Sequence, residues 1–380
     1  MDNIAPSFEG VHSTEQSSPI GKIKRVNHLG RGERFAWLDA AKGIAACIIV
    51  GHHLSEYSPS SNLADQFAPS LMYGIYNYGL FVVHLFLVFG GFAMVMMTPN
   101  HSISWRQASS LFTARYVRLV VPYLVMLLFL VTVFWAGLCD GMIPPLIDSF
   151  SWWQLLAHVF FLQDILGLGN LSAGTWYLCI DIQYVGYFLL IQATLNTLGR
   201  IVGRDLASPS VMSILLFPLG MISIGYWSRI LENEIFVFYF LGSLVLGTLV
   251  GWELKGQLAP WVVVLYVIGM AGSLAIELRP RVLVALGAAL ILVVAVRLGR
   301  KWSVPLPLQW LGKISYSLFL IHYLVNALVL HGLTPWIGRS PYRAFVSMLV
   351  AFSVSLLAAA ALHYMVEAPC HRWLKSQKQN

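Results

Sequence analysis

Ionisable side chains lie in an otherwise apolar segment near the start of the chain. Lys42 and His53 are eleven residues apart, close to three turns of α-helix, so a helix would place both on one face about 16 Å apart. Asp39 lies one turn before Lys42 and can pair with it. Such groups are costly in an apolar segment unless they face protein or water. The shared face favours a polar stripe; the structural alternatives are a snorkelling Lys42 and an interfacial His53.

Two later segments carry further candidates. Arg115 and Arg118 lie one turn apart, and such a pair suits phosphate because the planar guanidinium binds two oxygens at once. Asp181 lies in an apolar segment that should bring it near the depth of His53, and a carboxylate beside an imidazole fixes its tautomer and raises its basicity. The alternatives are ordinary charge anchoring for the arginines and a satisfied polar cluster around Asp181.

A third segment contains His84 and the pair Gly90 and Gly91. Paired glycines let two helices approach closely, so we expect a packing role for them. His84 either lines the same cavity as His53 or is a hydrogen-bonded packing residue.

The elements that hold these residues must be membrane helices. Of the 380 residues, 58% are hydrophobic and only 11% are charged, less than half the usual charged share and too few to cover a soluble surface. A spanning helix needs about 20 apolar residues. Eleven apolar runs approach that length, at residues 37–54, 76–97, 119–137, 152–168, 176–198, 211–227, 235–252, 259–276, 282–298, 314–333 and 344–365.

Basic residues decide which runs cross the membrane, since they collect on the cytoplasmic side. No Lys or Arg occurs between residues 119 and 199, which fits one crossing out and one back, so the short polar run 152–168 should not span. The predicted inside segments then hold 18 basic residues and the outside loops five. The fold class is therefore an all-α polytopic membrane protein with about ten transmembrane helices, one short re-entrant or interfacial helix and both termini cytoplasmic. We expect a disordered tail at 1–34, a membrane domain at 35–368 and a second cytoplasmic tail at 369–380.

Other functional classes find no support in the sequence. The net charge of +7 lies in the gaps between apolar runs, the pattern of topology signals and lipid contacts, so we expect no nucleic-acid partner. There is no G-x-S-x-G elbow, phosphate-binding loop or H-E-x-x-H pair, and we expect no metal. The four cysteines show no disulfide framework.

Six blocks, in order, resemble the acyltransferase-3 family of integral membrane O-acyltransferases. The resemblance covers about residues 34 to 372 and departs from the family pattern at three places: His84 stands where an acid is usual, Gly90 where Ser is usual, and Asp181 where Glu is commoner. The blocks are residues 38–45 with His53, residues 86–92, Arg115 and Arg118 with Pro122 and Tyr123, residues 176–184, residues 311–322, and Glu367 with Pro369.

The resemblance implies a stand-alone enzyme of the bacterial inner membrane, without an appended esterase-like domain. It would transfer an acyl group, most often acetyl, from cytoplasmic acyl-CoA to a glycan hydroxyl at the outer face. By residue, the resemblance makes His53 the catalytic base, lets Lys42 line the donor path, lets Arg115 and Arg118 hold coenzyme A phosphates, and makes Asp181 orient His53 or contact the acceptor.

The resemblance also implies the partners. The donor acetyl-CoA or another acyl-CoA is a substrate, and no cofactor is bound permanently. The acceptor would be a glycan or lipid-linked glycan such as lipopolysaccharide O-antigen, exopolysaccharide or peptidoglycan, with membrane lipids and envelope polysaccharide assembly proteins as further partners. Two rival functions remain: a secondary transporter, whose intramembrane charges would relay protons, and a glycan polymerase or flippase without acyl-CoA chemistry.

Overall fold

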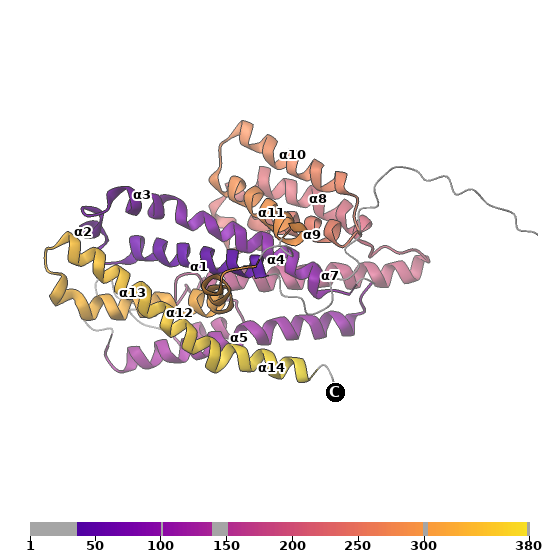
Figure 1. Ribbon diagram of the computed structural model, residues 1–380. Helices are drawn as coiled ribbons and strands as arrows, with labels where there is room; N and C mark the ends of the chain where they lie inside the picture. The colour runs from indigo at the N-terminus through magenta and orange to yellow at the C-terminus, as the bar shows by residue number, and fades with distance from the viewer. Residues whose placement is uncertain (1–35, 100–101, 139–150, 299–302, 378–380) are drawn as a thin grey trace, which may run out of the picture.

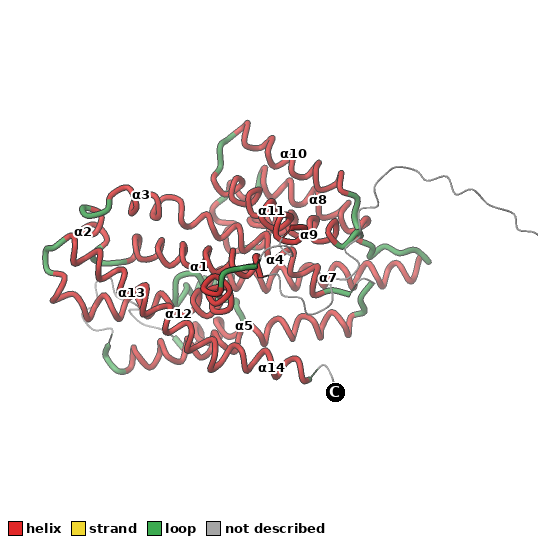
Figure 2. Tube along the Cα trace, in the orientation of Figure 1, coloured by secondary structure: helices red, strands yellow, loops and turns green. Residues whose placement is uncertain are grey.

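The computed structural model describes residues 36–99, 102–138, 151–298 and 303–377, and in this part of the chain helices are joined by turns and loops, without β-strands (Figure 2). The predicted tail at 1–34 lies outside the described residues. The helices are α1 (Ala36–Tyr57), α2 (Ser61–Asp65), α3 (Pro69–Tyr78), η1 (Gly79–Val82), α4 (Val83–Met97), α5 (Trp105–Trp135), α6 (Trp152–Val159), α7 (Thr175–Val202), α8 (Pro209–Gly225), η2 (Trp227–Arg229), η3 (Leu231–Ile235), α9 (Val237–Leu254), α10 (Pro260–Ile276), α11 (Pro280–Leu298), α12 (Leu306–Ile337), α13 (Pro341–Leu362), η5 (His363–Glu367) and α14 (Ala368–Ser376).

Length and composition confirm an all-α polytopic membrane protein. Among the described residues, eight helical segments are long and apolar enough to cross a bilayer. Two other helices match the remaining predicted spans: α10 is apolar but has 17 residues, and α1 has 22 residues and carries Asp39 and Lys42. The count of ten and the cytoplasmic termini stay predictions.

The two ends of the bundle differ. Helices α2 and α3 and the turn between α12 and α13 gather at one end, and α14 ends toward the other (Figure 1). Helices α2 and α3 lie mostly between the apolar runs 37–54 and 76–97, in a stretch without Lys or Arg for which the apolar pattern predicts no spanning helix. At the predicted cytoplasmic end, the segment assigned to the tail from residue 369 continues as helix α14 to Ser376.

Helix α6 confirms that the run 152–168 does not cross the membrane. It has eight residues, which rise about 12 Å, far less than the hydrocarbon core of about 30 Å. Ser151 caps its first turn by accepting a hydrogen bond from the backbone N–H of Gln154. Trp152 and Trp153 are 75% and 74% exposed, which is typical of aromatic residues at a membrane interface.

A close crossing joins α1 and α12. A Cβ atom added to Gly312 would lie 2.4 Å from the backbone oxygen of Asp39, and one added to Gly43 would lie 2.7 Å from the backbone nitrogen of Gly312. Only glycine at both positions allows this approach. The crossing therefore fixes the relative height of the two helices.

A second glycine crossing joins α4 and α9. A Cβ on Gly91 would lie 1.9 Å from the backbone oxygen of Leu244, and one on Gly247 would lie 1.8 Å from that of Val88. The predicted packing role is confirmed for Gly91. The approach does not require glycine at residue 90, because a Cβ there would make only ordinary contacts, with Leu244 on α9 at 3.7 Å and with Tyr177 and Asp181 at 3.8 and 3.9 Å.

The helices bury two apolar cores. One is built mainly on α4, α7, α8, α9 and α11, and the other on α1, α5, α12 and α13. Figure 1 shows α8, α9, α10 and α11 grouped on one side of α4 and α7, with α1, α5, α12 and α13 grouped on the other. Phe86 and Tyr177 pack against both cores, so they mark the seam between the two helix groups.

Candidate active site

A pair of histidines forms the centre of the site. Nδ1 of His53 lies 2.7 Å from Nε2 of His322, and the two rings stack with centroids 5.0 Å apart. His53 is ten residues beyond Gly43 on α1, and His322 is ten residues beyond Gly312 on α12. Both helices therefore rise about 15 Å from their common crossing to the histidines. The glycine contact thus sets the height at which the imidazoles meet.

The hydrogen bonds fix the tautomer of both neutral rings. Nδ1 of His322 lies 2.9 Å from the backbone oxygen of Leu318, and a carbonyl can only accept, so this nitrogen carries the hydrogen. The Nε2 atom of His322 is then an acceptor, and Nδ1–H of His53 donates to it. Consequently Nε2 of His53 keeps its lone pair, and the structure shows no hydrogen bond to it from any described residue. A ring held in this way is suited to accept a proton.

Asp181 does not pair with His53, and this part of the prediction is wrong. Its two carboxylate oxygens accept a two-pronged hydrogen bond from Arg115, with Nε to Oδ2 at 2.9 Å and Nη2 to Oδ1 at 2.7 Å. The helices explain the difference. Tyr177 on α7 meets Phe319 on α12, and one turn further Asp181 interacts electrostatically with Tyr316. Helices α7 and α12 thus run antiparallel, and Asp181 lies about 10 Å from the level of His322 along the bundle.

The two predicted phosphate-binding arginines therefore differ. Arg115 is largely enclosed, with 16% of its side chain exposed, and its guanidinium is committed to Asp181. Arg118, one turn further along α5, is exposed and makes no ion pair within the described part of the chain. Of the two, Arg118 is the one whose donors are free for a phosphate.

A buried carboxylate near Arg118 was not assigned a role from the sequence. Glu367 accepts hydrogen bonds from Ser317 Oγ at 2.8 Å and from His363 at 2.9 Å, and it interacts electrostatically with Arg118. A π-turn at His363–Glu367 sets its position. Pro369 provides a physical reason for that turn, because it lacks an N–H and its ring clashes with the carbonyl four residues earlier.

Lys42 and Asp39 form the predicted ion pair, with Nζ 2.8 Å from Oδ1. The Lys42 side chain is 36% exposed, so it has access to the surroundings at its end of α1. On the face that runs from Lys42 to His53, however, Ala46 and Ile49 are 1% and 3% exposed and belong to an apolar core. Lys42 and His53 are thus joined by the helix rather than by further polar side chains.

Tyr123 and His158 fasten the segment around α6 to α5. The Tyr123 hydroxyl lies 2.5 Å from Nδ1 of His158, and the backbone N–H of Leu171 donates to Nε2 at 3.3 Å. Burial lowers the pKa of His158 to about 4, so the ring is neutral at physiological pH. Tyr123, which belongs to the block with Arg115, Arg118 and Pro122, therefore has a structural role: it holds the segment around α6 against α5.

His84 takes the role of a packing residue. Its Nδ1 lies 2.9 Å from Ser243 Oγ on α9, and its ring packs against Phe240 with centroids 6.1 Å apart. These contacts hold α4 and α9 together rather than joining the histidine pair.

The family model of the acyltransferase-3 family, described as an acyltransferase domain, matches residues 35–364. The chain belongs to this family. It is therefore a membrane acyltransferase, which removes the transporter and polymerase alternatives. No curated protein and no solved structure matches the chain.

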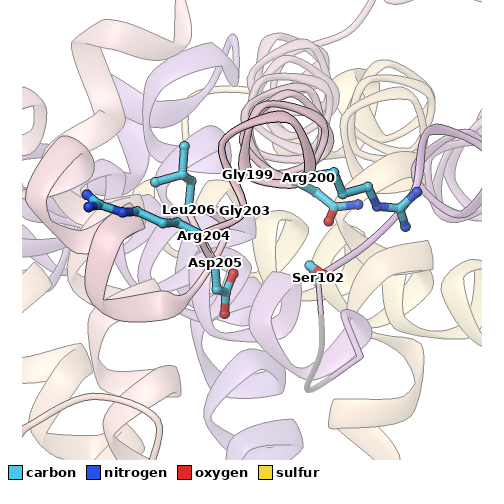
Figure 3. Close-up of a pocket in the computed structure, with 8 residues that line it drawn as sticks. Ser102, Gly199, Arg200, Gly203, Arg204, Asp205 and Leu206 are labelled. Carbon is cyan, nitrogen blue, oxygen red and sulfur yellow. The ribbon is translucent and has the colours of Figure 1, made fainter.

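A cavity of about 320 Å³ in this acyltransferase lies elsewhere, at the end of α7. Figure 3 shows that the side chains of Arg200 and Arg204, which both line the cavity, extend away from each other, with Asp205 and Ser102 between them. None of the five predicted site residues lines it. The lining residues are Ser102, Asn196, Gly199, Arg200, Gly203, Arg204, Asp205 and Leu206.

Sequence reasoning missed His322 as the partner of His53, although a signal was present. Both histidines follow a glycine by ten residues, in the blocks that contain Gly43 and Gly312. Two parallel helices that cross at such glycines must bring the histidines to one height.

Proposed function

We propose that this acyltransferase moves an acyl group, acetyl in the simplest case, from cytoplasmic acyl-CoA to a hydroxyl of a cell-envelope glycan at the outer face of the bacterial inner membrane. The observation that carries the proposal is the hydrogen-bond chain from Leu318 through His322 to His53. It leaves one imidazole nitrogen as a proton acceptor in a membrane protein of an acyltransferase family.

In the proposed step, Nε2 of His53 takes the proton of the acceptor hydroxyl as that oxygen attacks the thioester carbonyl carbon. An oxygen–carbon bond forms and the carbon–sulfur bond breaks. The departing thiolate takes the proton back from His53, so the products are the ester and the free coenzyme A thiol. His322 holds the ring in the required tautomer, as an orienting partner does in other histidine-based sites.

The donor's charged part would stay at the opposite end of the bundle. Arg118 offers an exposed guanidinium and Lys42 a partly exposed ammonium, and both suit phosphate groups. Arg115 holds Asp181 near Arg118, about 10 Å from the level of the histidines. Only the uncharged pantetheine arm and the acyl group then have to reach His53, since moving the phosphates through the apolar bundle would be costly.

The proposal is tested by supplying native membranes with radiolabelled acetyl-CoA. Labelled envelope glycan and free coenzyme A thiol are measured for the wild type, His53→Ala and His52→Ala. His52 is the matched control, because it is the neighbouring buried imidazole but bonds Ile75 rather than His322. We expect His53→Ala to lose at least about a hundredfold of the rate while His52→Ala stays active. Wild-type transfer by His53→Ala at an equal protein level would refute the proposed role.

The class of acceptor is read from the same membranes. Mass spectrometry of their glycans, with and without the gene, identifies the acyl group and the sugar position. An ester that disappears with the gene supports a glycan acceptor, whereas unchanged glycans together with measurable thioester cleavage would move the acceptor to another class.

A further inference from the structure

Three aromatic side chains lie between the two polar levels of the bundle. Phe86, Tyr177 and Phe319 come from α4, α7 and α12, and their ring centroids are 6.2, 6.5 and 5.7 Å apart in the three pairings. Such separations are typical of rings in direct contact. Tyr177 lies one turn from Asp181, and Phe319 lies one turn from His322. The three rings therefore separate the Arg115–Asp181 level from the histidine pair.

The rings also stand at the seam of the molecule. Phe86 and Tyr177 pack against both apolar cores, where the two helix groups of Figure 1 meet. On the Asp181 side of these rings the seam is lined by Gly90, whose missing side chain leaves the Tyr177 hydroxyl and Asp181 3.8 and 3.9 Å from its Cβ position. A group that moves along the seam from Asp181 toward His53 thus meets the aromatic rings next.

Contacts behind the rings restrict how far they can move. The Tyr177 hydroxyl donates to the backbone oxygen of Phe86 at 3.2 Å. Phe319 is backed by Gly174, where a Cβ would lie 3.0 Å from the tip of the ring. Gly174 itself has φ +89°, a conformation that favours glycine. The space that opens when a ring turns is therefore small.

We propose that Phe86, Tyr177 and Phe319 form the constriction that the acyl group passes on its way to His53, and that they limit transfer to short acyl chains. The inference rests on the acyl transfer proposed above. An acetyl group adds little width or length to the pantetheine arm, whereas each further methylene must be fitted between rings that already touch. The three side chains are thus specificity-determining residues that do not take part in bond making.

The test compares acetyl-, butyryl- and octanoyl-CoA as donors in native membranes, by release of free coenzyme A thiol that depends on the glycan acceptor. We expect the wild type to use acetyl-CoA at least about tenfold faster than octanoyl-CoA. Phe319→Ala should lower this ratio by about tenfold or more, in the range that a few methylenes contribute in a shaped pocket. Phe86→Leu opens the same place with a smaller loss of packing and should lower it less.

Phe89→Ala is the matched control, because it removes a buried ring from the same helix outside the constriction. It should reduce the amount of folded protein without changing the ratio. A wild type that uses octanoyl-CoA as fast as acetyl-CoA would overturn the inference without any variant. So would an unchanged ratio in active Phe319→Ala or Phe86→Leu, or an equal shift in Phe89→Ala. Absence of transfer from every acyl-CoA would instead refute the proposed function.

Discussion

The orienting role of His322 leads to a prediction that can be worked out from the structure. His322→Phe keeps a planar ring on α12 but removes the acceptor for Nδ1–H of His53. A buried donor left without a partner costs about 1–3 kcal/mol. If this cost is paid when the His53 ring adopts its reactive orientation and tautomer, the rate of acyl transfer drops by about 5- to 150-fold, since each 1.36 kcal/mol is a factor of ten.

The assay is acetyl transfer in native membranes, with rates followed from pH 5 to 9. His322→Gln places an amide oxygen where Nε2 of His322 was and should recover most of the rate, which a purely space-filling role would not predict. The double variant His53→Ala with His322→Phe should be no slower than His53→Ala alone, because residues that act as a unit are not additive. A His322→Phe rate within a factor of two of the wild type, with an unchanged pH profile, would refute the reasoning.

Three other predictions concern the elements that hold the site. Gly312→Ala should lower both the unfolding temperature in detergent and the transfer rate, because the added Cβ would meet the backbone of α1 at a cost of about 1–3 kcal/mol. Gly332→Ala is the control on the same helix: it has open space around it and should change neither quantity. Asp181→Asn should lower the free energy of unfolding by about 3–5 kcal/mol, because Arg115 is left as an enclosed, unpaired charge. The double variant Arg115→Met with Asp181→Leu should regain part of that loss in the same thermal assay. A double variant less stable than Asp181→Asn would count against the pairing. Burial lowers the pKa of His158 to about 4 in the folded state, so the unfolded chain binds more protons than the folded one between about pH 6.5 and 4. The free energy of unfolding should therefore fall by about 2–3 kcal/mol as the pH drops through that window. His158→Gln should flatten this part of the stability profile, and an equally steep profile would assign the pH dependence to other groups.

Much of the fold could be predicted because each membrane helix can be recognised from its own apolar run, without knowledge of its neighbours. Apolar length and the positions of Lys and Arg predicted nearly every helix and the failure of 152–168 to cross. The helices α2 and α3 were missed, because α2 is too short to show a helical period and α3 lies in a stretch without basic residues that resembles an outer loop. The π-turn before Pro369 was missed because apolar periodicity is insensitive to one extra residue in a turn.

Pairing within the site was harder to predict than membership of it. His53, Asp181 and Arg115 are enclosed polar residues and Lys42 is partly exposed, as expected of charges in apolar segments that face protein or water. Which of them meet depends on the rotation and height of α1, α5 and α7, and a glycine crossing fixes the height of α1 only relative to α12. The single pairing predicted within one helix, Asp39 with Lys42, is present, whereas the one predicted between helices, Asp181 with His53, is not.

The replacement of that expected pairing has a chemical consequence. A carboxylate hydrogen-bonded to His53 would fix its tautomer and would also stabilise the imidazolium that forms when the base takes a proton. A neutral imidazole such as His322, whose own hydrogen is committed to a backbone carbonyl, orients His53 without adding charge. The carboxylate Asp181 instead lies beyond the aromatic rings, where it offsets Arg115. The bundle thus keeps its ion pair at the level proposed for the donor and a neutral, oriented base at the level proposed for the acceptor.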